Sequence, residues 1–194
     1  MKKLSALTLL FLTSLTSQAA PVVSTSSSLR GFAYRLEPLI GFEQVYRAYP
    51  SSHTVSRPVY GLRLGAGSDK LALEGEYLHG EDSENFSLAP QKITNKDDLF
   101  KLGVRSSFLI SNSFFLIVRA GAEASRNINE TTTNTQLVSV ENPFKLNPYT
   151  GVQLGYRIGK GFNISVGSTV VIKEIGDLTK NDYQNTLSIG IGTN

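Results

Sequence analysis

Apolar and polar residues alternate along most of the chain from Arg35 onward. The segment 99–109, for example, reads LFKLGVRSSFL, with apolar residues mainly at even positions and charged, glycine or serine residues mainly at odd ones. A period of two residues is typical of a β-strand whose two faces meet different environments. The pattern predicts eight strands, at residues 35–48, 59–67, 71–79, 99–109, 114–125, 149–158, 162–172 and 187–192.

The connections between these segments alternate in length. Short links at 68–70, 110–113 and 159–161 separate longer links at 49–57, 80–98, 126–147 and 174–182. Short turns at one end and long loops at the other are typical of up-and-down membrane barrels, with the turns on the periplasmic side. We therefore predict an all-β fold, an eight-stranded antiparallel up-and-down transmembrane β-barrel.

The N-terminus has the three parts of a secretory signal peptide. A basic start, Met1-Lys2-Lys3, precedes the apolar run 4–15 and the small residues of Ser17-Gln18-Ala19. An apolar run of this length fits a signal peptide and is too short for a membrane-spanning helix. We predict a signal peptide at 1–19, a periplasmic leader at 20–34 and the barrel domain at 35–194.

Alternation alone does not say which face of the barrel is apolar. Aromatic residues on the apolar face gather near the predicted strand ends, which is typical of girdles at two membrane–water interfaces. A soluble barrel with an apolar interior would instead place large rings at mid-strand. The predicted girdles comprise Tyr46, Tyr60, Tyr77, Phe100 and Tyr183 beside the long loops, and Phe108, Phe114, Tyr156 and Phe162 beside the short turns.

The opposite face carries charges of both signs together with many glycines. An eight-stranded barrel is only wide enough inside for side chains, so these charges would pair there and the glycines would make room for the arginines. A solvent-exposed charged face on a soluble barrel is the alternative interpretation. The predicted lumen network comprises Arg35, Glu37, Glu43, Arg47, Arg63, Glu74, Glu76, Lys101, Arg105, Arg119, Glu123 and Arg157.

In strand pattern and loop rhythm, residues 35–193 resemble the small outer-membrane β-barrel superfamily, which includes the OmpA transmembrane domain and the OmpX and Ail proteins. The resemblance implies a bacterial outer-membrane location, contact with membrane lipid and lipopolysaccharide, and insertion by the barrel-assembly machinery. Such barrels usually end in an aromatic residue, whereas this sequence ends IGIGTN.

Composition excludes several classes of function. The chain has no cysteine, which excludes disulfides and thiolate metal sites. Without Lys2 and Lys3 the formal charge of +3 falls by two, so no nucleic-acid partner is expected. We predict no cofactor and no metal.

The resemblance also raises the possibility of a lipid A-modifying acyl enzyme. Such enzymes need a histidine, and the chain has two. A loop site of His53 with Asp82-Ser83 would be similar to the palmitoyltransferase arrangement. For a deacylase-like site at His79, Tyr77 occupies the place of the required serine. We predict no catalytic residue and keep this enzyme as a third alternative.

The favoured prediction is an outer-membrane barrel with a structural or surface-exposed interaction role and a charged, filled lumen. An adhesin that binds an extracellular ligand through its long loops is the second alternative, because loops on a rigid scaffold commonly carry function. A conducting pore is not expected, because paired charges would fill a barrel this narrow.

Overall fold

The computed structural model describes residues 33–47, 52–68, 70–86, 91–133, 136–159 and 161–192. The predicted signal peptide and residues 20–32 of the predicted leader lie outside this part of the chain. The first strand begins at Ala33, two positions before the predicted start of the barrel. In the described residues, no helix has the length and apolar character that a membrane crossing requires.

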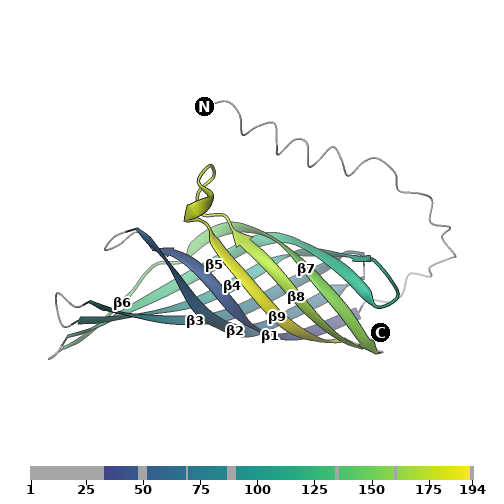
Figure 1. Cartoon of the computed structure of the whole chain (residues 1–194), viewed down its shortest axis with the longest axis horizontal. Helices are drawn as coiled ribbons and strands as arrows, with labels where there is room; N and C mark the ends of the chain where they lie inside the picture. Colours follow the sequence, from purple (N-terminus) through teal and green to yellow (C-terminus); the bar gives the residue numbers. More distant parts are fainter. Residues whose placement is uncertain are drawn as a thin grey trace. The chain divides into compact units, whose positions relative to one another are not determined.

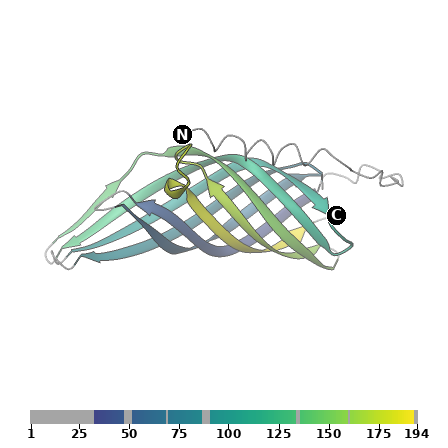
Figure 2. The same ribbon diagram turned by 45° about the horizontal axis from the view of Figure 1, so that its top comes forward.

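Eight strands close into a ring (Figures 1 and 2). Every pairing is antiparallel, and the contacts of β1 with β9 and of β4 with β5 complete the circle. The predicted eight-stranded antiparallel barrel is therefore confirmed. The strands are β1 (Ala33–Arg47), β2 (His53–Gly67), β3 (Ala72–Phe86), β4 (Gln91–Leu109), β5 (Phe114–Thr133), β6 (Leu137–Glu141), β7 (Lys145–Gly159), β8 (Phe162–Val171) and β9 (Asp182–Gly192).

The short β6 lies outside the ring. Its ladder runs along the far part of β5, from Ile128 opposite Glu141 to Thr132 opposite Leu137. Nearer the middle of the barrel, β7 takes over as the partner of β5, beginning at Ser125 opposite Lys145. The strand β6 therefore widens one end of the barrel wall and does not help to close it.

Tight turns join β2 to β3, β4 to β5 and β7 to β8, where the sequence predicts short links. The backbone N–H of Ser68 donates to the carbonyl of Leu71 at 2.9 Å, and that of Ile110 donates to Phe114 at 2.9 Å. Gly161 has φ 83°, a left-handed conformation that glycine adopts without steric cost. We call this end of the barrel the turn end and the opposite one the loop end.

At the loop end, much of what the sequence predicts as loop is strand. The predicted loops 49–57, 80–98 and 126–147 contain residues 53–57, 80–86, 91–98, 126–133 and 137–141 of the strands. Most of these residues are polar on both faces and therefore show no apolar alternation, yet the backbone ladder continues through them. The fourth predicted loop, 174–182, holds a 3₁₀ helix at Leu178–Lys180, and β9 begins at Asp182, ahead of the predicted start at 187.

The apolar face of the barrel wall lies outside. The side chains of Leu62, Leu102 and Leu154 are 40%, 72% and 50% exposed. Their neighbours Arg63 and Lys101 are buried within the ring, at 0% and 4% exposed. Alternate residues of one strand therefore point to an apolar exterior and a polar interior. This is the arrangement of a membrane barrel and the reverse of a soluble one.

Four strands extend at the loop end beyond this apolar exterior. Their outward-facing side chains change from apolar at Phe100 to charged at Asp98 and Lys96 on β4, and to Arg126 and Glu130 on β5. In Figure 1 these segments form the tapering end that carries the label β6. We call residues 80–86, 91–98, 126–133 and 137–141 the protruding sheet.

Candidate functional site

A row of alternating charges crosses the interior of the barrel. In the strand register Glu37 faces Arg63, Arg63 faces Glu76, Glu76 faces Lys101, and Lys101 faces Glu123. The five residues lie on five consecutive strands and all are buried. Each cation of the row is therefore flanked by two carboxylates.

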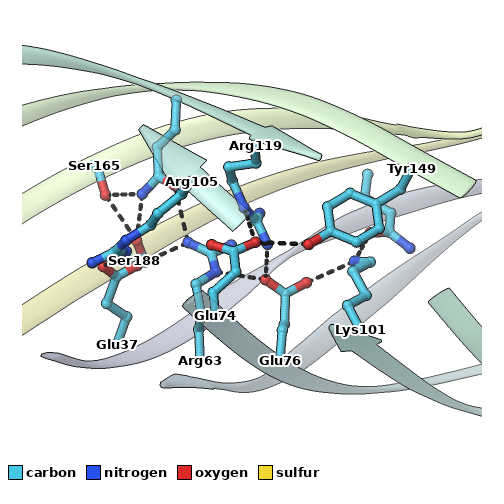
Figure 3. A network of polar contacts seen from close by, with 12 residues as sticks. Glu37, Arg63, Glu74, Glu76, Lys101, Arg105, Arg119, Tyr149, Ser165 and Ser188 are labelled. Atoms are coloured by element: carbon cyan, nitrogen blue, oxygen red, sulfur yellow. Dashed lines mark hydrogen bonds and ion pairs between the residues drawn. The ribbon is translucent and has the colours of Figure 1, made fainter. Parts of the chain in front are cut away.

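The side chains of this row bind one another closely, and Figure 3 labels four of them, Glu37, Arg63, Glu76 and Lys101. Arg63 donates from Nη1 to Glu37 at 2.8 Å and from Nε to Glu76 at 2.6 Å. Lys101 Nζ lies 2.6 Å from Glu76 and 3.5 Å from Glu123. Charge-assisted bonds of this length compensate the loss of hydration that burial imposes on each group.

Further residues extend the network toward the opposite wall. Arg119 donates to Glu74 at 2.6 Å and to Glu76 at 2.7 Å, and Arg105 donates to Glu37 at 2.7 Å. The hydroxyl of Tyr149 donates to Glu74 at 2.8 Å. These contacts bring β1, β3, β4, β5 and β7 together across the interior, so that side chains fill it.

Neutral polar groups continue the network on β7, β8 and β9. Arg63 donates to the side-chain oxygen of Gln153 at 2.9 Å, and Gln153 donates to Ser188 at 3.1 Å. Ser188 and Ser165 share a hydrogen bond of 2.8 Å. Sequence analysis missed these residues because a search for charges does not single out amides and hydroxyls.

Glycines on the inner face make room for the larger side chains. A Cβ atom on Gly65 would lie 2.9 Å from Nη2 of Arg105. A Cβ on Gly103 would lie 2.3 Å from the hydroxyl of Tyr149. The polar face therefore combines long side chains with glycines, because the interior of the barrel is narrow.

A second cluster of ion pairs lies nearer the loop end. Arg57 is buried and binds Glu43 through Nε at 2.8 Å, and it also contacts Asp97. Arg47 lies 2.8 Å from Asp82 and 3.4 Å from Asp97. Sequence analysis missed the ion pairs of Arg57, Asp82 and Asp97 because it assigned all three residues to loops.

The structure brings most of the predicted lumen residues together. Arg35 and Arg47 lie at the two ends of β1 and are only partly buried. Arg157 is exposed at the turn end, where its guanidinium lies over the ring of the buried Phe115 at 5.7 Å, so its part in the lumen network stays a prediction. Its position fits the inward parity of β7, but the barrel ends there. The nine that are buried are Glu37, Glu43, Arg63, Glu74, Glu76, Lys101, Arg105, Arg119 and Glu123.

The predicted girdle residues face outward, and several pack in tilted pairs. Ring centroids lie 5.1 Å apart for Tyr77 and Phe100, and 5.0 Å apart for Phe114 and Tyr156. The ring of Tyr60 packs against that of His79 in a tilted arrangement, with centroids 5.4 Å apart. Tyr60, Phe108 and Phe162 are exposed, whereas Tyr46 and Tyr183 are half-buried. Sequence analysis missed Tyr34 and Phe42, which are exposed on the same face.

One carboxylate marks the boundary between the apolar exterior and the protruding sheet. Asp98 accepts hydrogen bonds from Tyr77 at 2.8 Å, His79 at 3.0 Å and Arg126 at 2.9 Å. Partial burial raises the pKa of Asp98, but the hydrogen bonds from Arg126, His79 and Tyr77 outweigh that effect and lower it to about 2. Asp98 therefore stays ionised near neutral pH and holds the side chains of Tyr77, His79 and Arg126 together. We call this group of four residues the rim.

The histidines do not assemble the lipid A enzyme sites considered from the sequence. His53 lies 3.1 Å from Glu84, while Asp82 accepts from Asn95 at 2.9 Å on the inner face. Ser83 faces outward and pairs with Thr94 at 3.0 Å. The loop arrangement of His53 with Asp82 and Ser83 is therefore not formed.

A cavity of about 810 Å³ opens at the loop end, above the Arg57 cluster. It is enclosed by inward-facing residues of β4, β5 and β6, the end of β1, the start of β7 and the segment 173–182. We call it the vestibule. Among the described residues, no three histidine or acidic side chains are grouped in a way that could hold a metal ion.

Comparisons with known proteins give a likeness of fold. No protein-family model and no curated relative matches the sequence. Among solved structures, the chain is similar to the attachment invasion locus protein Ail of Yersinia pestis in complex with the heparin analogue sucrose octasulfate. The TM-score is 0.52 and the sequence identity is 14%, and the match covers 84% of this chain and 97% of that one. Neisserial surface protein A has TM-score 0.56 and 10% identity over 84% of this chain and 98% of that one.

These neighbours are small β-barrels of bacterial outer membranes. The strand ring, the apolar exterior and the polar filled interior of this chain agree with that architecture. The chain therefore has the fold of the small outer-membrane β-barrels, and its apolar exterior fits the outer-membrane location of these neighbours.

Proposed function

We propose that this outer-membrane barrel is a surface-exposed interaction protein in which a rigid, closed barrel supports a sheet that contacts partners outside the cell. The observation that carries the proposal is the protruding sheet. Its strands continue the ladder beyond the apolar exterior, so the backbone there is ordered by the barrel below it. Ordered elements on a rigid scaffold are suited to recognition.

The outer face and the free edge of the protruding sheet give it two kinds of contact surface. Lys96 and Glu130 pair at 2.8 Å on the outer face. All five residues of β6 are exposed, and within the described part of the chain β5 is its one ladder partner. A strand edge of this kind offers unpaired backbone donors and acceptors to another protein.

The filled lumen supports a closed barrel and not a pore. Arg63 on β2 binds carboxylates on β1 and β3 and donates to Gln153 on β7. Arg119 on β5 binds Glu76 on β3, and both arginines are buried. We expect no stepwise conductance from the purified protein in planar lipid bilayers. Such a barrel also fits a purely structural role in the envelope, which is the alternative that the experiment below separates.

An adhesin is the more specific form of the interaction proposal. The protruding sheet and the vestibule support it, because both lie at the loop end, which by the usual orientation of such barrels faces the exterior. We further propose contact with lipopolysaccharide along the exposed apolar wall and insertion by the barrel-assembly machinery.

A lipid A-modifying acyl enzyme stays the least favoured alternative. His53 binds Glu84 and His79 binds Asp98, so each histidine is paired with an acidic residue outside the sites considered from the sequence. Mass spectrometry of lipid A from cells with and without the protein tests this alternative. A changed acylation pattern would support the enzyme against our proposal.

The register of the sheet allows a precise truncation. Asp82 faces Asn95, and Asn129 faces Val140, so residues 83–94 and 130–139 can each be replaced by an Asn-Gly turn that rejoins paired strands. Cells displaying this variant should lose binding to host-cell surfaces or to immobilised envelope proteins that the full chain binds. The truncated variant should still migrate differently in boiled and unboiled samples on a detergent gel, because its ring of strands is intact. Equal binding by the full chain and the truncated variant would contradict the interaction function and favour the structural one.

A further inference from the structure

We infer that the vestibule binds a short, uncharged oligosaccharide through the side-chain amides that line it. The inference deepens the proposed interaction function and rests on it in placing the vestibule outside the cell. The volume of about 810 Å³ lies within the range of roughly 300–1,000 Å³ that is usual for small-ligand sites.

Asparagine side chains from several elements line the vestibule. Asn95 comes from β4, Asn127 and Asn129 from β5, Asn142 from the link after β6, and Asn147 from β7. Asn95 faces Asn129 across the β4–β5 ladder, and Asn142 donates to Asn127 at 3.0 Å. An amide has two donors and an oxygen with two lone pairs, so a row of amides complements neighbouring hydroxyls.

Two of these amides hold unused hydrogen-bonding atoms. Nδ2 of Asn127 and Oδ1 of Asn129 are buried and have no hydrogen-bond partner among the residues that the structure describes. The residues are adjacent inward positions of β5, spaced about 7 Å along a strand. One is a donor and the other an acceptor, so a ligand must both accept and donate to satisfy them.

That requirement selects the chemistry of the ligand. A hydroxyl group both donates and accepts, whereas a sulfate or an ionised phosphate accepts and an ammonium group donates. An unpaired buried polar atom costs free energy that a hydroxyl of the ligand would recover. The two amides therefore favour a hydroxyl-rich molecule over an anion.

The charges around the vestibule point the same way. Lys173 binds Asp182, Lys180 lies 2.9 Å from Glu174, and Arg47 binds Asp82. Because acids of the chain already bind these three cations, a polyanion would gain little attraction from them, and the Nε of Arg47, unpaired within the described part of the chain, adds one donor that a ligand hydroxyl can satisfy. Lys145 has no acidic partner among the described residues and supplies one further donor.

The rest of the lining suits the carbon face of a sugar ring. Val45, Ile93, Leu99 and Val140 line the cavity between the polar groups. The amides of Asn127 and Asn129 project from the inner face of β5, so β5 would contact a ligand through side chains and not through its backbone. A peptide would instead be expected to pair with a strand edge. This geometry favours a saccharide over a peptide.

The test uses the full chain refolded in a zwitterionic detergent, because detergents with sugar headgroups would compete. Calorimetric titration with maltotriose, N-acetylchitotriose and lacto-N-tetraose supplies uncharged probes, with sucrose octasulfate and a neutral Gly/Ser/Thr hexapeptide as comparisons. We expect saturable binding of at least one uncharged saccharide, and at least tenfold weaker binding of both comparison ligands. Absence of binding by all three saccharides, or preference for either comparison ligand, would overturn the inference.

Variants locate the binding. Asn127→Ala and Asn129→Ala should each weaken saccharide binding about tenfold, the effect of losing one or two ligand hydrogen bonds. Asn85→Ala removes an exposed amide from the outer face of the same sheet and should change nothing. Asn127→Asp keeps the shape of the side chain but replaces its unpaired donor with an acceptor, so it should also weaken binding and serves if an alanine variant folds poorly. Unchanged affinity in the folded vestibule variants would contradict the inference.

The two proposals fail separately. The vestibule variants keep the protruding sheet, so partner binding by cells that display them tests the interaction function alone. Retained partner binding without saccharide binding would end the inference and leave the proposed function standing. If the chain binds the saccharide but the sheet truncation leaves partner binding unchanged, the inference would stand and the proposed function would be contradicted.

Discussion

Arg63 and Glu76 lie thirteen positions apart in the sequence, and Nε of the arginine donates to the carboxylate at 2.6 Å across β2 and β3. The same guanidinium binds Glu37 on its other side at 2.8 Å. Because both carboxylates are buried, the arginine compensates two desolvated charges at once. Arg63 therefore joins Glu37 and Glu76 into one ionic network of the lumen.

Replacement of this arginine should therefore be costly. We predict that Arg63→Met lowers the free energy of unfolding by about 3 kcal/mol, the lower end for breaking a buried pair, because Arg105 and Arg119 still bind the two carboxylates. Urea unfolding of the protein in lipid vesicles measures the change. Lys92→Met, on the exposed outer face of the protruding sheet, is the control and should change stability little. Equal stability of the two variants would show that the lumen network is not a stabilising unit.

The glycines of the wall give a matched pair of substitutions. Gly103→Ala would place a Cβ 2.3 Å from the Tyr149 hydroxyl and 2.5 Å from the Ala120 carbonyl oxygen. We predict a loss of about 1–3 kcal/mol in unfolding free energy, because the backbone of β5 must move. Gly75→Ala meets nothing within 4 Å and should be neutral or stabilising by up to about 1 kcal/mol. Thermal unfolding that ranks the two variants in the opposite order would contradict the observed packing of the lumen.

The sequence predicts the barrel wall well, because one physical requirement acts on each residue there. Leu102 must face lipid and Lys101 must not, so the period of two is visible without any alignment. The loop end lacks that constraint. Asp82 and Asp97 lie in strands whose faces both meet water or the vestibule, and their polar stretches are indistinguishable from loops in composition.

The pairing of charged side chains inside the barrel also cannot be predicted from the sequence. The alternation shows that Arg63 points inward, but strand register decides whether it meets Glu37, Glu76 or both. Register depends on the lengths of turns and loops, and a shift of two residues would keep every face while changing every partner. The amides of the vestibule are hidden for a related reason, because Asn127 and Asn129 resemble ordinary loop residues until β5 aligns them.

The rim should respond to acid through Asp98. Its pKa of about 2 in the folded protein lies below the ordinary value of 3.8. A carboxylate whose pKa is lowered by folding stabilises the fold when ionised, so this contribution is complete above about pH 4 and is lost as the pH falls through about 2. We predict that the stability difference between the wild type and Asp98→Asn shrinks as the pH falls from about 4 toward 2.

Unfolding at a series of pH values measures that difference. In an Arg126→Met background Asp98 loses one of its donors, so its pKa rises and the decline moves to higher pH. If the effect of Asp98→Asn on stability does not depend on pH in either background, the hydrogen bonds at the rim do not act on the ionised form.

The central claim is the orientation of the wall, with apolar side chains against lipid and charges enclosed. Because the chain has no cysteine, single substitutions give clean sites for spin labels. Leu102→Cys lies on the outer apolar wall of β4, and Thr94→Cys lies on the same face of the same strand within the protruding sheet. In lipid vesicles the label at position 102 should collide with oxygen and be shielded from a water-soluble nickel chelate, and the label at position 94 should show the reverse. Strong nickel accessibility at position 102, equal to that at position 94, would contradict the account.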